Sequence, residues 1–408
     1  MGKTAIRERI TFALLAAFAV ALLTFALVAH LQDTSSWDDL MGFYTAGRVF
    51  REAPQSRLYD PQVEMYYQQK TFGRVSELRV YDHTPVEILV FWPLSYLPYW
   101  AAYLSWDFLN LALLGWSLCL LKPYAGNLDT AARLILTAVI AYPLISTLRE
   151  GQDSIPLLLA FSVAFVSLKK GNQIAAGCAL GAGLCRFQFV LPCLLVFLAR
   201  RRWRVLLGAL AAGGGLGVLS VALVGWNGVR SYVKWLLTVT KYGRYYVPTI
   251  GMPNVRGFAE ALLANRVGHG YLNVLVAASS FILVGWVIRK WGRADWDPGK
   301  KAFDLLFSLN LVVSLLVAYN SFMHNLILLA LPVLLLLHYC AGSSRFGLAR
   351  WRLVLPLILL ILMTCLLNLE GGNRFTFLFM PLLWLALAIS REIPPAREQA
   401  GGGGSGHC

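Results

Sequence analysis

The sequence predicts an all-α membrane protein that crosses the bilayer many times. Hydrophobic residues make up 58% of the 408 residues, whereas only 14% are charged. A soluble globular domain of average composition has about a quarter of its residues charged. Apolar runs of about 20 residues, the length of a membrane-spanning helix, recur along the chain between short basic segments. These observations exclude an ordinary soluble protein and predict a polytopic fold.

The first helix is predicted at residues 10–29, after Lys3, Arg7 and Arg9. This run is longer than a signal-peptide core and is followed by no convincing cleavage site, so we expect an uncleaved helix with a cytoplasmic N-terminus. Residues 31–97 then form an outer loop. Its polar and aromatic character favours amphipathic helices that lie on the membrane surface.

The remaining apolar runs predict helices whose basic flanks fall on the cytoplasmic side, as the positive-inside rule requires. With the first helix they make about twelve: 98–121, 131–148, 155–168, a pair within 173–199, 205–224, 271–288, 302–319, 326–340, 353–369 and 375–390. The range 173–199 is too short for two full spans, so we expect two short helices that meet at the outer sequence "CRFQ".

These helices are expected to form one membrane domain over residues 1–390, with a second outer loop at 225–270 and a flexible cytoplasmic tail at 391–408. The formal net charge is +15, but the basic residues punctuate apolar segments and do not cluster on one soluble stretch. We therefore expect membrane lipids and phosphate groups as partners, and no nucleic acid.

Polar residues collect at the outer ends of the predicted helices. They include two adjacent carboxylates, an imidazole and several guanidinium groups: Asp38, Asp39, His83, Gln152, Arg186, Gln188, Arg256 and His324. Such a set suits an anionic substrate that carries hydroxyl groups.

Six segments resemble one known family, in matching order. They are "DDLMGFYTAGRVFREAPQSRLYDPQ", "YDHTPVEILVFWPLSYLPYWAAYLSWDFLNLALL", "LREGQDSIPLLLAFSVAF", "AGCALGAGLCRFQFVLP", "GMPNVRGF" and "YNSFMHNLILLALPVLLLL". Together they resemble glycosyltransferase family 87, the polyprenol-phosphate-mannose-dependent mannosyltransferases of the GT-C superfamily. The resemblance implies an integral membrane fold with a catalytic first outer loop, a lipid-phosphate sugar donor and an inverting transfer.

The resemblance also implies roles for single residues. Counting back from Phe43 and Tyr44 in the family pattern assigns the general base to Asp39 and not to Asp38. The donor phosphate is expected at Arg186, Arg256 and His324, and the other substrate contacts at Tyr44, His83, Gln152, Gln188 and Asn254. The family often has Lys-Pro-Gln where this chain has "RFQ", and His-Asp where it has "HN". These differences from the family pattern do not change the reaction class that the resemblance implies. They leave the identities of the sugar and of the acceptor open.

The chemistry of the donor follows from its location. Nucleotide sugars are cytoplasmic, so an outward-facing transferase needs a sugar that crosses the bilayer on a lipid. A polyprenyl phosphate sugar fits, because its leaving phosphate needs cations and no strong general acid. Asp39 would accept the acceptor proton during an attack from the face opposite the phosphate. We therefore predict a hexosyltransferase with a polyprenyl-phosphate sugar donor and a glycolipid or glycan acceptor, at the extracytoplasmic face of a bacterial inner membrane. The resemblance implies mannose as the sugar, with glucose or a pentose as the alternatives.

No cofactor and no metal ion are expected from the sequence. It has no Asp-x-Asp cluster placed to bind a metal together with a nucleotide diphosphate, and a monophosphate among arginines does not require one.

Other functions stay open at this point. A secondary transporter would show an internal repeat and helices broken at the membrane midplane. A flippase for lipid-linked sugars would need a basic outer cavity but no base at Asp39. At single residues, Asp38 and Asp39 can be helix N-caps, Arg256 can extend to the membrane interface, and Gln152 can hydrogen-bond a helix end.

Overall fold

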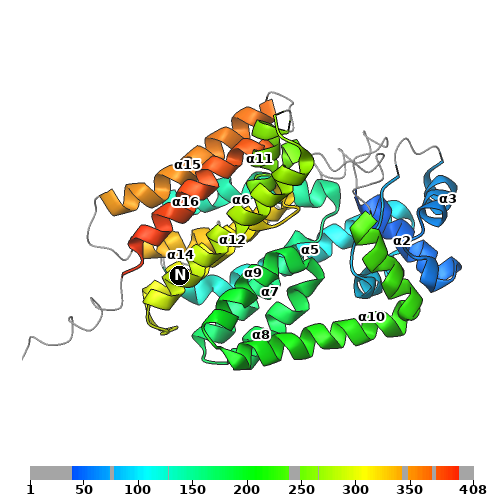
Figure 1. Ribbon diagram of the computed structural model, residues 1–408, viewed down its shortest axis with the longest axis horizontal. Helices are drawn as coiled ribbons and strands as arrows, with labels where there is room; N and C mark the ends of the chain where they lie inside the picture. The colour runs from blue at the N-terminus through cyan, green and yellow to red at the C-terminus, as the bar shows by residue number, and fades with distance from the viewer. Residues whose placement is uncertain are drawn as a thin grey trace, which may run out of the picture. The chain divides into compact units, whose positions relative to one another are not determined.

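The computed structural model describes residues 39–73, 78–126, 128–238, 249–264, 266–341, 348–369 and 374–394. Every element in these ranges is helical, and no strand occurs in them (Figure 1). The predicted all-α class is confirmed. The predicted first helix, Asp38 and the tail beyond residue 394 lie outside the described residues.

The chain is a multi-pass membrane protein. In the described ranges, eight helical segments are long and apolar enough to cross a membrane. Seven of them are α5 (Tyr99–Ala125), α6 (Thr130–Glu150), α10 (Trp203–Thr238), α12 (His269–Arg293), η6 (Met323–Leu329) continued by α14 (Ala330–Ala341), most of α15 (Leu348–Leu369), and η7 (Phe375–Leu378) continued by α16 (Phe379–Glu392). The eighth, Gln173–Ala199, has the length and apolarity of a span but consists of two short helices, which are described below. Each of them overlaps a helix predicted from the sequence.

Two compact units make up the fold. The first is drawn from the ranges Met1–Gly115, Ile145–Asp153 and Gly217–Tyr246. The second is drawn from Trp116–Leu144, Ser154–Leu216 and Val247–Cys408. The two units are described separately below.

Short helices make up the N-terminal part of the first unit. They are α2 (Leu40–Glu52), η1 (Gln55–Arg57), α3 (Pro61–Phe72), η2 (Pro85–Glu87) and α4 (Ile88–Leu94), in the range where the sequence predicts helices of an outer loop. Gly47 allows α2 to approach α4 closely, because a Cβ at this position would lie 2.5 Å from the carbonyl oxygen of Phe91. The glycine-ended stretch after Asp39 is therefore a packing motif that fixes α2.

α10 changes direction at Gly225, whose backbone has φ 69° and ψ 171°. Glycine adopts such a positive φ without the steric penalty of a side chain. The predicted helix at 205–224 ends at this break. Residues 226–238 continue as helix, and α11 (Val255–Leu263) follows after η5 (Thr249–Gly251), so the range predicted as a second outer loop contains helices.

In the second unit, α8 (Gln173–Ala182) and α9 (Phe187–Ala199) are joined by the 3-10 turn η3 (Gly183–Arg186). α8 and the start of α10 run parallel to each other. The residue numbers of the contacts between these two parts of the chain rise in the same direction: Gly177 with Val205, Gly181 with Ala209, and Leu184 with Gly213. Only residues 200–202 separate α9 from α10. The chain must therefore reverse between α8 and α9, as the predicted pair of short helices meeting at "CRFQ" requires.

Basic segments predicted to be cytoplasmic gather at one end of the second unit. Lys169, the last residue of α7 (Ser154–Lys169), pairs with Asp304 of α13 (Lys301–Val317) at 2.7 Å. The Arg200 guanidinium donates to the carbonyl of Ala294 at 3.4 Å, and that of Arg202 lies 3.9 Å from the centroid of the Trp296 ring. The last two contacts join "RRRWR" to "RKWGRADWD", and the first joins "KKGN" to the start of α13, which follows "RKWGRADWD" in the chain. The positive-inside pattern places these basic segments on one side.

Candidate active site

Asp39 lies at the N-cap position of α2, but its side chain makes no capping hydrogen bond to that helix. Its carboxylate instead accepts a hydrogen bond from the side-chain amide of Gln152, with 2.5 Å between Nε2 and Oδ2. Nη1 of Arg79 lies 3.9 Å from the other carboxylate oxygen, and the Asp39 side chain is 38% exposed. The structure thus presents a partly exposed carboxylate that a distant part of the chain orients.

A tight turn after α6 positions Gln152. Gly151 has φ 66°, the left-handed conformation in which glycine commonly ends a helix. Three side chains spaced along one face of α5 hold this turn. Tyr103 donates to the carbonyl of Leu148 (2.8 Å), Trp106 to that of Gly151 (2.8 Å) and Asn110 to that of Gln152 (3.4 Å). The backbone of the buried Gln152 is therefore fixed as well as its side chain.

α3 holds the extended segment that carries Arg79. Gln68 accepts a hydrogen bond from the Arg79 N–H (3.0 Å) and donates one to the Arg79 carbonyl, and Glu64 accepts one from the Tyr81 N–H (3.3 Å). Glu64 is buried. Burial raises the pKa of its carboxyl well above the usual range, and the charges of Asp82 and Asp60 raise it further.

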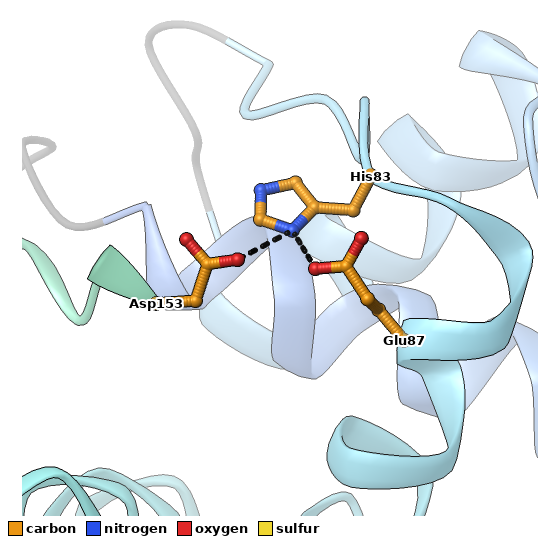
Figure 2. Close-up of side chains that lie close together, drawn as sticks. All are labelled: His83, Glu87 and Asp153. Carbon is orange, nitrogen blue, oxygen red and sulfur yellow. Dashed lines mark hydrogen bonds and ion pairs between the residues drawn. The ribbon is translucent and has the colours of Figure 1, made fainter. Parts of the chain in front are cut away.

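His83, Glu87 and Asp153 converge in a largely buried cluster of the first unit (Figure 2). Nδ1 of His83 lies 2.8 Å from Oε2 of Glu87 and 3.6 Å from Oδ2 of Asp153. The imidazole packs against Phe43, with 4.3 Å between the ring centroids, and stacks on Tyr81 at 5.6 Å. Because Asp153 directly follows Gln152, this cluster is one residue away from the hydrogen-bond donor of Asp39.

Arg186 and His324 belong to the second unit, and both lie toward the Ser154 end of α7. Arg186 ends η3, and Gly183 of the same turn packs against side chains in the first half of α7, Leu157 and Ala160. His324 is buried, and the amide of the following residue, Asn325, donates to the Ser154 hydroxyl at 2.9 Å. Gln188, half-buried, is the second residue of α9 after the reversal.

Asn254 and Arg256 connect α11 to the segment that precedes His324. The buried Asn254 caps α11, since its Oδ1 accepts from the Gly257 N–H (2.8 Å), and its amide donates to the carbonyl of Ala318 (2.7 Å). Arg256 pairs with Glu260 (3.1 Å) and donates to Oδ1 of Asn320 (2.9 Å). Its guanidinium also lies 4.0 Å from the centroid of the Tyr319 ring. Both polar atoms of the Asn254 side chain therefore bind backbone groups of the protein, and the Arg256 guanidinium already has a carboxylate partner.

The predicted site residues therefore form two groups. In the first unit, Asp39 and Gln152 are in contact and His83 joins the same turn through Asp153. The buried Tyr44 donates to the carbonyl of Leu97 (2.8 Å). In the second unit, the remaining predicted residues share one end of the helices: Arg186, Gln188, Asn254, Arg256 and His324.

Sequence reasoning missed Arg79, Glu87 and Asp153. The four-residue spacing of His83 and Glu87 at the start of a helix is a signal that predicts their contact. No local pattern predicts the other two, because α3 places Arg79 and the turn after α6 places Asp153.

Comparisons with known proteins identify the family. The chain matches no curated protein, but the model of glycosyltransferase family 87 matches residues 81–318. The match includes His83, Gln152, Arg186 and Arg256, whereas Asp39 and His324 lie outside it. Since the matched range is more than half of the chain, the protein belongs to glycosyltransferase family 87 and is a membrane glycosyltransferase.

Proposed function

We propose that this glycosyltransferase transfers mannose from a polyprenyl-phosphate donor to a hydroxyl group of a glycolipid or glycan. The reaction takes place at the extracytoplasmic face of a bacterial inner membrane, proceeds with inversion, and uses Asp39 as the general base. Family membership favours this reading over a flippase or a secondary transporter, because it implies glycosyl transfer itself.

The observation that carries the proposal is the state of the Asp39 side chain. An aspartate at a helix N-terminus usually accepts hydrogen bonds from the first turn. Asp39 makes no such bond, is partly exposed, and is oriented by Gln152. A carboxylate that is held in place but open to a substrate is suited to remove a proton.

The chemical step is a single displacement. The acceptor oxygen forms a bond to the anomeric carbon while its proton passes to Asp39. The bond between that carbon and the phosphate oxygen breaks on the opposite face, and both of its electrons leave with polyprenyl phosphate. A β-linked donor therefore yields an α-linked product.

The departing phosphate needs positive charge more than it needs a proton. We assign this role to Arg186, Arg256 and His324 of the second unit. Arginine suits the task because its planar fork of N–H donors matches phosphate oxygens. Arg256 would have to share its guanidinium between the phosphate and its present partner Glu260.

The test is transfer by the purified full-length protein in lipid nanodiscs. Polyprenyl-phosphate mannose, polyprenyl-phosphate glucose and a mannose nucleotide diphosphate are offered in parallel with a panel of lipid-linked and soluble glycan acceptors. We expect transfer from the mannose lipid alone, with an α-linkage in the product by NMR. Transfer from the nucleotide sugar, or a β-linked product from a β-linked lipid donor, would overturn the proposal.

A further inference from the structure

We propose that His83, Glu87 and Asp153 bind one divalent transition-metal cation. Each residue offers one ligand atom, and the three atoms lie within 4.8 Å of one another (Figure 2). His83 and Asp153 are buried and Glu87 is nearly so, with side-chain exposures of 2% for His83, 11% for Glu87 and 9% for Asp153. The cluster joins two segments that lie far apart in the sequence.

The spacing of the ligand atoms fits a common centre. Metal–nitrogen and metal–oxygen bonds of about 2.0–2.2 Å separate neighbouring ligands by about 3.0–3.5 Å in octahedral or tetrahedral sites. The two measured separations, 2.8 and 3.6 Å from Nδ1 of His83, lie on either side of this range. The carboxylate oxygens of Glu87 and Asp153 lie within 4.8 Å of each other, so the two carboxylates would turn toward one ion as it binds.

Surrounding groups orient these ligands as a metal site requires. Oδ1 of Asp82 lies 3.6 Å from Nε2 of His83. Without an ion, Nδ1 of His83 is the atom that donates to the Glu87 carboxylate, so an ion would take the place of the Nδ1 proton. The Asp82 carboxylate at Nε2 then favours the tautomer with its proton on Nε2, which leaves the Nδ1 lone pair for the metal. Oε1 of Glu87 accepts hydrogen bonds from the backbone N–H (3.0 Å) and the hydroxyl (2.7 Å) of Thr84. These bonds direct Oε2 of Glu87 toward His83.

The ligand types select the class of cation. One imidazole with two carboxylates suits Mn²⁺, Fe²⁺ or Zn²⁺ better than Ca²⁺ or Mg²⁺, which favour sites built from oxygen alone. A divalent ion would also balance the two carboxylate charges around a neutral imidazole. Three protein ligands leave positions for water or for an oxygen of a substrate.

The cation would help to fix the position of the Asp39 carboxylate. It would tie Asp153 to the segment that carries His83, and Gln152, which binds Asp39, directly precedes Asp153. This effect on transfer rests on the proposed function, whereas binding of the ion does not. Such an ion differs from the expectation of metal independence, which rested on the lack of an Asp-x-Asp cluster and on a monophosphate donor held among arginines.

The experiment measures binding directly. Full-length protein in nanodiscs is stripped with EDTA, exchanged into metal-free buffer and titrated with Mn²⁺, with free Mn²⁺ followed by electron paramagnetic resonance. We expect one saturable Mn²⁺ per chain, displaced by Zn²⁺, with a nitrogen coupling that His83→Gln abolishes. His83→Gln and Asp153→Asn should weaken binding by about 100-fold or more, and Asp82→Asn by about 10- to 100-fold.

Two variants guard against effects of misfolding. Glu87→Gln keeps an oxygen for the Thr84 hydrogen bonds but should also weaken binding, whereas Asp60→Asn, an N-cap of α3, should bind as wild type does. Size-exclusion profiles of all variants check folding. No saturable binding by wild type, or equal binding by His83→Gln and Asp153→Asn, would overturn the site. A protein that binds Mn²⁺ as expected but transfers no sugar would keep the site and overturn the proposed function.

Discussion

The side-chain amide of Gln152 donates a hydrogen bond to the carboxylate of Asp39 across 113 positions of sequence. Gln152 lies on a turn that three side chains of α5 hold, and Asp39 precedes a helix that packs into the core of the first unit. The backbones of Gln152 and Asp39 are therefore both held in place by their surroundings. This arrangement keeps one face of the Asp39 carboxylate in a fixed direction without using it to cap α2.

Gln152→Ala should slow transfer by about 10- to 100-fold, because a hydrogen bond to a charged group is worth about 1.5–3 kcal/mol. If Gln152 positions the base, the loss will fall on kcat with little change in KM for the donor. Steady-state kinetics of the purified variant check this split. Gln69→Ala, on the exposed face of α3, is the control. Equal effects of both substitutions would contradict the positioning role.

Gly151→Ala should destabilise the protein by about 1–2 kcal/mol, because a Cβ in the left-handed conformation meets the neighbouring carbonyl. It should also slow transfer, since Gln152 follows directly. Gly214→Ala is the matched control, because that glycine lies inside α10 and a Cβ there would meet nothing within 4 Å. Thermal unfolding of both variants measures the difference, and a Gly151→Ala protein as stable and active as wild type would show that the turn tolerates a side chain.

Glu64 should make stability fall as pH rises. Its pKa in the folded protein lies well above the ordinary value of 4.5, so folding favours the protonated form. This stabilisation is complete below pH 4.5 and is lost as the pH rises through the raised pKa. Glu64→Gln keeps an acceptor for the Tyr81 N–H and removes the titration.

The difference between the two proteins should therefore grow with pH, by about 1.4 kcal/mol per unit between the unfolded and folded pKa values. Chemical unfolding of wild type and Glu64→Gln at a series of pH values measures it. Curves that stay parallel would mean that Glu64 does not titrate in this range.

Arg186→Ala and Arg256→Ala should each weaken donor binding by about 1.5–3 kcal/mol if these residues hold the phosphate. Glu260→Gln should strengthen it, because it releases the Arg256 guanidinium from a charged partner. Equilibrium binding of a fluorescent polyprenyl-phosphate sugar measures all three, with the exposed Arg133→Ala as control. Unchanged affinity in both arginine variants would place the phosphate elsewhere.

Local patterns predicted the helices well because a bilayer imposes length and apolarity on each span. The end of the predicted helix at 205–224 coincides with the break at Gly225, and the short range 173–199 does contain a reversal. Residues 226–238 were harder, since Arg230 and Lys234 make the segment too polar to be recognised as a membrane span. Its helical form depends on packing, for instance of Trp235 in the core of the first unit.

The site was less predictable than the fold. Asp39 and Gln152 each carry a sequence signal, but their hydrogen bond depends on how α6 ends and on the face of α5 that holds the turn. The same holds for Asp153, which reaches His83 only through tertiary packing. Contacts between distant segments have no local pattern from which they can be predicted.

The most direct test of the account is the rate of sugar transfer by Asp39→Asn. The substitution keeps the shape of the side chain and removes the base, so transfer from polyprenyl-phosphate mannose should fall by about 10² to 10⁴-fold. Donor affinity and thermal stability should stay near wild type, because Asp39 does not cap α2. Asp60→Ala removes a residue that does cap a helix, so it should show the opposite pattern of some lost stability with transfer retained. Near-normal turnover by Asp39→Asn would contradict the assignment of Asp39 as the general base.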